Sequence, residues 1–78
     1  MMSEKIIEMI NEWNPIDIYP LLEEEYEDEV NQIKEACGHS QTSEQLGEMI
    51  HHIFTQSFGQ EFTKSREECN RMARKIKT

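Results

Sequence analysis

The sequence predicts an all-α fold, a small bundle of about four amphipathic helices with an irregular, proline-bounded corner after the first helix. Apolar residues recur three or four positions apart along four segments of the chain, which is the spacing of one helix face. No segment alternates apolar and polar residues with the period of two that a half-buried strand shows. Caps and helix-stopping residues separate the four segments, so the connections are short, as they are in helical bundles.

The first helix is predicted to follow Ser3, whose hydroxyl suits an N-cap. Its apolar stripe consists of Ile6, Ile7, Ile10 and Trp13. Asn14-Pro15 ends this helix, because the residue before a proline is pushed out of the α-helical region. We expect residues 15–19 to form a single helical or 3₁₀ turn that Pro20 cuts off.

The second helix is predicted to begin somewhere in residues 21–25 and to end at Gly38, which suits the C′ position. Acidic residues fill its first turns, where the helix dipole favours negative charge. Its apolar stripe consists of Leu22, Tyr26, Val30, Ile33 and Cys37, with Ala36 alongside.

The third and fourth helices each follow a capping-box pattern, at residues 42–45 and 65–68. The third helix is predicted to stop at Gly59, and Glu67 and Arg71 are spaced for an i,i+4 ion pair on the fourth. The apolar stripes are Leu46, Met49, Ile50, Ile53, Phe54 and Phe58 on the third helix, and Cys69, Met72, Ala73 and Ile76 on the fourth.

A chain of 78 residues has room for one domain, residues 1–78. No apolar run approaches the roughly 18 residues that a membrane span needs, and the first residues carry acids rather than a signal peptide's cationic start. We therefore expect a cytoplasmic protein that does not associate with membranes. In a reducing cytoplasm, Cys37 and Cys69 are expected to be small, buried, reduced residues.

Charge is unevenly distributed along the chain, whose formal net charge is −8. Residues 1–40 hold eleven acids and two bases, whereas residues 63–78 hold six bases and two acids. Binding to a nucleic acid backbone is disfavoured for such a chain. Two interpretations of the asymmetry remain open: the basic C-terminal helix complements the acidic half within the fold, or the surface is bipolar and steers partners.

No motif predicts a cofactor, a metal or an enzyme. The histidines at 39, 51 and 52 and the two cysteines lack the close ligand pairs of a zinc site. The run of acids at 23–29 lacks the spacing and glycine of a calcium loop, and is typical of a solvated helix face. A nucleophilic Cys37 or Cys69 with a nearby histidine is the remaining catalytic alternative, although Cys37 lies at a helix C-terminus and Cys69 on an apolar stripe.

The aromatic corner between the first two helices has two interpretations. In the first, Trp13 is the central core side chain, and Tyr19 and Tyr26 close over it with their hydroxyls at the surface. In the second, the corner is a docking surface, since aromatics rimmed by charge are common in interfaces. The candidate docking residues are Tyr19, Glu23, Glu24, Glu25, Glu27 and Asp28.

The corner also carries a family resemblance. Trp13-Asn14-Pro15-Ile16, Tyr19-Pro20, Glu25-Tyr26 and Glu29-Val30, followed by Ile53-Phe54 and Phe58-Gly59, occur in this order in residues 5–76. In this pattern the chain resembles the YugE-like small helical proteins of bacilli, a family of unknown function. The chain departs from it at Asn14, where aspartate is common, and at Leu21-Leu22, where the family is more polar. The resemblance implies an all-helical cytoplasmic protein and supplies no functional residues.

These observations favour a small, non-enzymatic protein–protein interaction module whose acidic face meets a basic protein partner. The alternative is an immunity or antitoxin-like acidic inhibitor that occupies the cationic site of a basic toxin. A third hypothesis is an enzyme that uses a Cys/His pair. We expect a monomer or a weak homodimer, because no heptad seam supports a coiled-coil interface.

Overall fold

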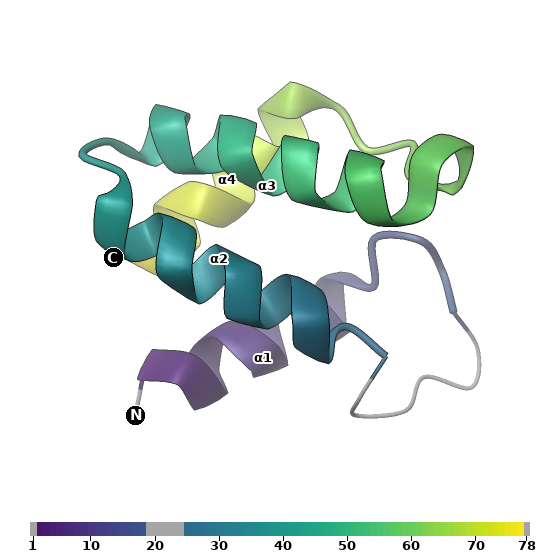
Figure 1. Cartoon of the computed structure of the whole chain (residues 1–78), viewed down its shortest axis with the longest axis horizontal. Helices are drawn as coiled ribbons and strands as arrows, with labels where there is room; N and C mark the ends of the chain where they lie inside the picture. Colours follow the sequence, from purple (N-terminus) through teal and green to yellow (C-terminus); the bar gives the residue numbers. More distant parts are fainter. Residues whose placement is uncertain (1, 19–24, 78) are drawn as a thin grey trace.

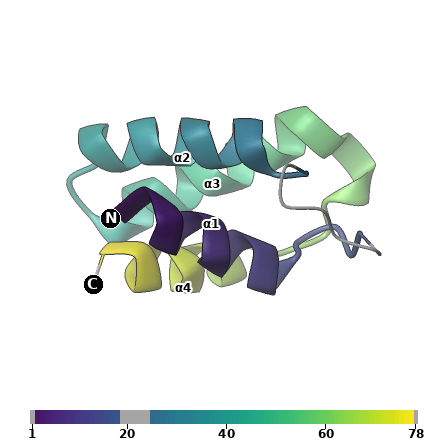
Figure 2. The same ribbon diagram turned by 90° about the horizontal axis from the view of Figure 1, so that it is seen from below.

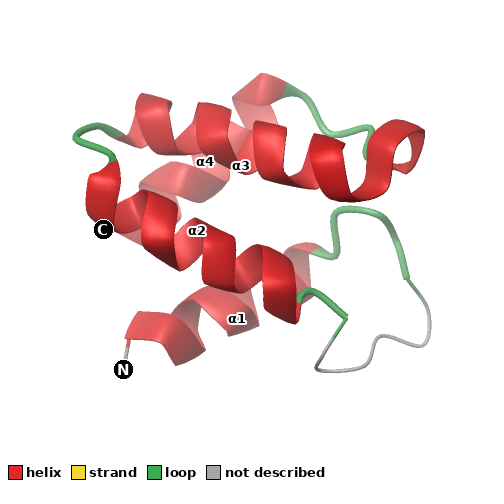
Figure 3. Ribbon diagram, in the orientation of Figure 1, coloured by secondary structure: helices red, strands yellow, loops and turns green. Residues whose placement is uncertain are grey.

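Helices make up all the regular structure in the described part of the chain (Figures 1 and 3). The computed structural model describes residues 2–18 and 25–77. In chain order these residues form α1 (Met2–Trp13), α2 (Glu27–His39), α3 (Ser43–Phe58), the short 3₁₀ helix η1 (Gly59–Glu61) and α4 (Arg66–Lys77). The predicted all-α bundle of four helices is confirmed.

The four helices form a closed ring of neighbours. Each helix packs against the next one in the chain, and α4 returns to contact α1. Successive helices run in opposite directions, so that the start of α1 and the end of α4 lie at the same end of the molecule (Figures 1 and 2). This is the up-down-up-down arrangement that short connections favour.

Helix α1 ends in a left-handed residue rather than at a simple break before proline. Asn14 has a φ of 45°, and its N–H donates to the Ile10 carbonyl at 2.8 Å. Asparagine tolerates this conformation better than most residues because its short polar side chain can hydrogen-bond locally. The predicted helical turn over 15–19 is wrong in extent: a turn covers Pro15 and Ile16, and Asp17 is again left-handed, with a φ of 52°. Residues 19–24 lie outside the described residues.

Helix α2 begins later than predicted, at Glu27 rather than within 21–25. Residues 25 and 26 form a turn, and the Tyr26 carbonyl accepts the first helical hydrogen bond, from the Val30 N–H at 2.8 Å. The helix also continues through Gly38 to His39, so the predicted stop at Gly38 is wrong. Extended Ser40 caps the helix with an N–H bond to the Ala36 carbonyl, so no left-handed glycine is needed there.

The predicted N-cap at Ser3 is wrong, because α1 begins at Met2 and Ser3 lies within its first turn. The predicted caps at Thr42 and Ser65 are confirmed. The Thr42 hydroxyl accepts from the Gln45 N–H at 3.1 Å, and the Ser65 hydroxyl accepts from the Glu68 N–H at 3.1 Å. In a capping box the Gln45 side chain would accept from the Thr42 N–H. Here it accepts from the N–H of the preceding residue, Gln41. Helix α3 stops where predicted, at Gly59, which has a φ of 57° that favours glycine.

The core is built around Tyr26 and Phe54, both fully buried. The prediction of Trp13 as the central core residue is wrong, since Trp13 is partly buried and packs edge-to-face on Phe54 with ring centroids 5.9 Å apart. Phe62, which no periodic stripe includes, is buried and stacks on Phe54 at 5.3 Å. Other fully buried apolar side chains include Ile10, Val30, Ile33, Leu46 and Ile50.

Helices α3 and α4 approach each other closely at Gly47. A Cβ atom at this position would lie 2.8 Å from the Asn70 Cα and would collide with the Asn70 side chain. Gly47 therefore lets the backbone of α4 lie directly against α3, and these two helices share the most extensive contact in the bundle.

Candidate docking surface

The corner that joins α1 to α2 is held by a buried polar network. The Tyr26 hydroxyl donates to Asn14 Oδ1 at 2.6 Å and accepts from the Ile16 N–H at 3.3 Å. Asn14 Oδ1 also accepts from the Ile18 N–H at 3.0 Å, while Asn14 Nδ2 donates to the Ile18 carbonyl at 3.0 Å. One asparagine side chain therefore pairs with both backbone groups of Ile18, as a neighbouring strand would.

This geometry overturns the prediction that the Tyr26 hydroxyl lies at the surface. Tyr26 is fully buried, and burial raises the pKa of its hydroxyl above the ordinary value of 10.0. Repulsion from the nearby carboxylates of Asp17, Glu25 and Glu29 raises the pKa further. The hydroxyl is thus a neutral hydrogen-bonding group that ties the start of α2 to the end of α1.

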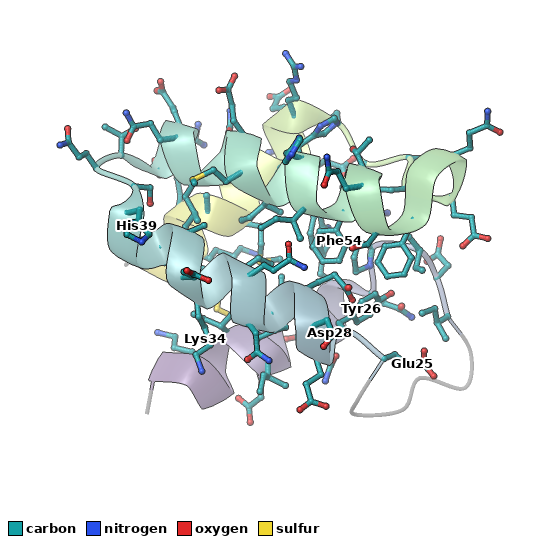
Figure 4. All side chains as sticks on the ribbon, in the orientation of Figure 1. Glu25, Tyr26, Asp28, Lys34, His39 and Phe54 are labelled. Carbon is teal, nitrogen blue, oxygen red and sulfur yellow. The ribbon has the colours of Figure 1, made fainter. Side chains whose placement is uncertain are left out.

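The described members of the predicted docking set lie next to Tyr26 in the chain. Glu25, Glu27 and Asp28 are exposed, and they flank Tyr26 on both sides along the chain. Figure 4 shows Glu25 and Asp28 at the start of α2, near the corner, while Lys34 extends from the middle of the helix. Tyr19, Glu23 and Glu24 lie outside the described residues. The structure therefore brings together three of the six predicted residues.

The three carboxylates form no ion pair with any described cation. Among the described residues, Glu67 and Arg71 of α4 form an ion pair with their charged atoms 3.6 Å apart, as predicted. Glu29, next in the sequence, is only 8% exposed. The exposed acids in the turn before α2 and in its first turn, Glu25, Glu27 and Asp28, form the acidic corner.

A second surface feature, which the sequence reasoning missed, is a groove of about 690 Å³ between α2 and α3. Its floor consists of Ala36 and Ile53, which are 6% and 8% exposed. Met49 was expected in the core stripe of the third helix, but it lines the groove and is 38% exposed. The rim consists of polar side chains from both helices, including Glu35, His39, Glu48 and His52.

The cysteines are poorly placed for nucleophilic catalysis. Cys69 is fully buried, and burial raises the pKa of its thiol from 9.0 to about 12, so the reactive thiolate is disfavoured. Cys37 is partly buried, so the expectation of a buried residue holds for Cys69 and only in part for Cys37. Both thiols are free. In the described ranges, no group of three His, Cys, Asp or Glu side chains is arranged to hold a metal ion.

None of the helices in residues 2–18 and 25–77 combines the length and the apolar character that crossing a bilayer requires.

Fold and surface together define a small all-α protein whose polar corner presents exposed carboxylates and whose α2–α3 face is grooved. The chain belongs to a family described as a domain of unknown function, DUF1871, whose model matches residues 5–78. The match covers all four helices apart from the first residues of α1. Comparison with curated proteins and with solved structures gave no match.

Proposed function

We propose that this protein is a small, non-enzymatic interaction module whose acidic corner binds a basic protein partner in the cytoplasm. One observation supports the proposal most directly. The acidic corner flanks Tyr26, whose buried hydroxyl is hydrogen-bonded to Asn14. We also propose that the chain is one of the YugE-like proteins of bacilli, on the motifs of the same corner. The alternative function, an acidic inhibitor of a basic toxin, would be the case in which the basic partner is a toxin. That alternative stays a prediction.

Rigid attachment favours binding because less conformational entropy is lost when a partner docks. Tyr26 is fully buried and hydrogen-bonded to two groups from residues 14–16, so the backbone on either side of it is held in place. Glu25 and Glu27 are the immediate neighbours of Tyr26. Their backbone positions are therefore set by the core rather than by a freely moving loop.

The sign of the charge selects the class of partner. Exposed carboxylates without a described cationic neighbour repel phosphate groups and attract lysine and arginine side chains. A long-range field of this kind mainly raises the association rate and excludes partners of the wrong charge. Basic protein surfaces fit this field, whereas nucleic acid backbones do not.

The test is capture of partners from a native lysate with three forms of the protein. The first is the wild type, and the second carries Glu25→Gln, Glu27→Gln and Asp28→Asn. The matched control neutralises three exposed acids elsewhere, through Glu8→Gln, Glu12→Gln and Glu61→Gln. Both variants change the net charge by the same amount, so any difference between them reports the location of the charge.

We expect the acidic-corner variant to lose basic partners that the wild type and the control retain, and we expect capture to weaken as salt increases. Mass spectrometry of the captured proteins identifies the partners. Equal recovery with all three forms would contradict the proposal, as would an equal loss with both variants.

A further inference from the structure

We propose that the groove between α2 and α3 is the docking site for a basic amphipathic helix, with its apolar stripe on Met49 and its cations along the α2 rim. This inference rests on the proposed function, because it specifies the shape and chemistry of the basic partner.

The floor of the groove is apolar. Ala36 of α2 and Ile53 of α3 form its base, and Met49 projects beside them. Among the described residues, Met49 is the large hydrophobic side chain that is left exposed. Methionine is flexible and polarizable, and it adapts to differently shaped apolar side chains at binding surfaces.

The shape of the groove suits a helix better than a compact small molecule. Seven of its ten lining side chains are exposed, so a small ligand there would remain largely in contact with water. The groove lies between two neighbouring helices, and α2 has 13 residues, which corresponds to about 20 Å of helix. A partner helix of about 14 residues would match this length. Its side chains would pack into the groove between α2 and α3.

The charge of the rim specifies a basic partner. Asp28, Gln32, Glu35 and His39 are spaced at i, i+4, i+7 and i+11, so they form one stripe along α2 beside the groove. Glu48 faces this stripe from α3, and no Lys or Arg is among the described residues that line the groove. Figure 4 shows Asp28 and His39 at opposite ends of α2.

The α2 and α3 walls of the groove differ in how close their carboxylates lie to cations of the same chain. Glu48 also borders two shallow hollows that Arg66 and Arg74 line, so cations of α4 lie near it. Glu35 is exposed and forms no ion pair with a described residue. The α2 rim, with Glu35 and Asp28, is therefore the wall that the partner's cations contact, and it joins the groove to the acidic corner.

The test uses a synthetic, fluorescein-labelled peptide of 14 residues, with leucines at helical spacing on one face and lysines on the others. Binding to the full chain is measured by fluorescence anisotropy near physiological salt. One control peptide has the same composition with the leucine stripe scrambled, and a second replaces each lysine by glutamate. We expect saturable binding of the amphipathic basic peptide and at least about tenfold weaker binding of both controls.

Two pairs of protein variants locate the binding. Met49→Glu places a charge beside the apolar floor, and the matched control Gln60→Glu adds the same charge at an exposed position of η1. We expect at least about tenfold weaker binding with Met49→Glu and a change within about twofold with Gln60→Glu. Glu35→Gln should weaken peptide binding several-fold. Its matched control, Glu61→Gln in η1, should leave binding unchanged. Both groove residues are exposed, so circular dichroism should show an unchanged fold.

The outcomes separate this inference from the proposed function. Absence of saturable binding, or equal effects of Met49→Glu and Gln60→Glu, overturns the groove as a docking site. In that case, loss of lysate partners with the acidic-corner variant would still support the proposed function. Peptide binding that depends on Met49 and Glu35, together with unchanged lysate capture by the acidic-corner variant, would support the groove and overturn the acidic corner.

Discussion

The hydroxyl of Tyr26 donates a hydrogen bond to Asn14 Oδ1 across 2.6 Å, and both side chains are buried. This bond links the residue that follows α1 to the residue that precedes α2, twelve positions later in the chain. Because buried polar groups are costly when unpaired, the two side chains depend on each other. The corner of the bundle is therefore held by a specific polar pair as well as by apolar packing.

Replacing Tyr26 by phenylalanine should destabilise the protein by about 1–2 kcal/mol, because the Ile16 N–H and one acceptor site of Asn14 lose their partner. Such a loss should lower the melting temperature by roughly 4–8 °C for each kcal/mol in a domain of this size. Thermal and urea unfolding, followed by circular dichroism, measure the change.

A double-mutant cycle with Asn14→Gly isolates the pair, since glycine keeps the left-handed backbone conformation but removes the amide. We expect the two substitutions to be non-additive by more than about 0.5 kcal/mol. Additive effects would show that the hydrogen bond contributes little beyond the separate side chains.

Local signals predicted much of the fold. The caps at Thr42 and Ser65, the stop at Gly59 and the Glu67–Arg71 pair depend on residues within four positions of each other, and all four are confirmed. Each of these features is encoded by nearby residues, and the packing of the bundle does not oppose it. The apolar stripes that define the four helices are local in the same sense.

Features that depend on tertiary contacts were predicted less well. Tyr26 sits at helical spacing from Val30, so periodicity placed it within the second helix. Its hydroxyl is instead bonded to residues 14–16, and the tyrosine remains in a turn before α2. Phe62 lies between η1 and α4, outside any periodic segment, yet it stacks on Phe54. Only the packing of distant elements places these two aromatic residues.

The same limit applies to the candidate site. The acidic corner is apparent in the sequence because its members are consecutive or nearly so. The groove combines α2 residues such as Glu35 with α3 residues such as Met49, and only the pairing of the two helices brings them together. Periodicity placed Met49 in the core because it cannot show where the contact between two helices ends.

Alanine at Gly47 should destabilise the bundle by about 1–3 kcal/mol, because the added methyl group would meet the Asn70 backbone at 2.8 Å. Gly38→Ala is the matched control: the site is helical, and no atom lies within 4 Å of the added Cβ. There, alanine should stabilise by up to about 1 kcal/mol, through its higher helix propensity. Urea unfolding of both variants measures the contrast. Similar effects of the two substitutions would argue against a close approach of α3 and α4 at Gly47.

Thr42→Ala should cost about 1 kcal/mol, because the Gln45 N–H at the start of α3 loses its side-chain acceptor. Thr42→Ser keeps a hydroxyl in the capping position and should stay within a few tenths of a kcal/mol of the wild type. Thermal unfolding of the two variants, under identical conditions, compares them. If serine were as costly as alanine, the methyl group of Thr42 rather than its hydroxyl would be the stabilising part.

The buried thiol of Cys69 predicts a specific loss of stability at alkaline pH. Burial raises its pKa from 9.0 to about 12, so the unfolded chain releases this proton at a lower pH than the folded chain. The folded state then binds more protons than the unfolded state between about pH 9 and 12, and the free energy of unfolding falls as pH rises through that window. The thiol contributes at most about 1.4 kcal/mol per pH unit to that fall.

Comparison of Cys37→Ala with Cys37→Ala/Cys69→Ala isolates this contribution, because the other alkaline-titrating groups are common to both proteins. Urea unfolding at several pH values should give a steeper decline for the protein that retains Cys69. A thiol reagent at pH 8 should label Cys69 only as the chain unfolds, while wild-type Cys37, which is partly exposed, reacts sooner. Equal slopes for the two proteins, or rapid labelling of Cys69 in the folded state, would show that the thiol is accessible and that burial does not control its chemistry.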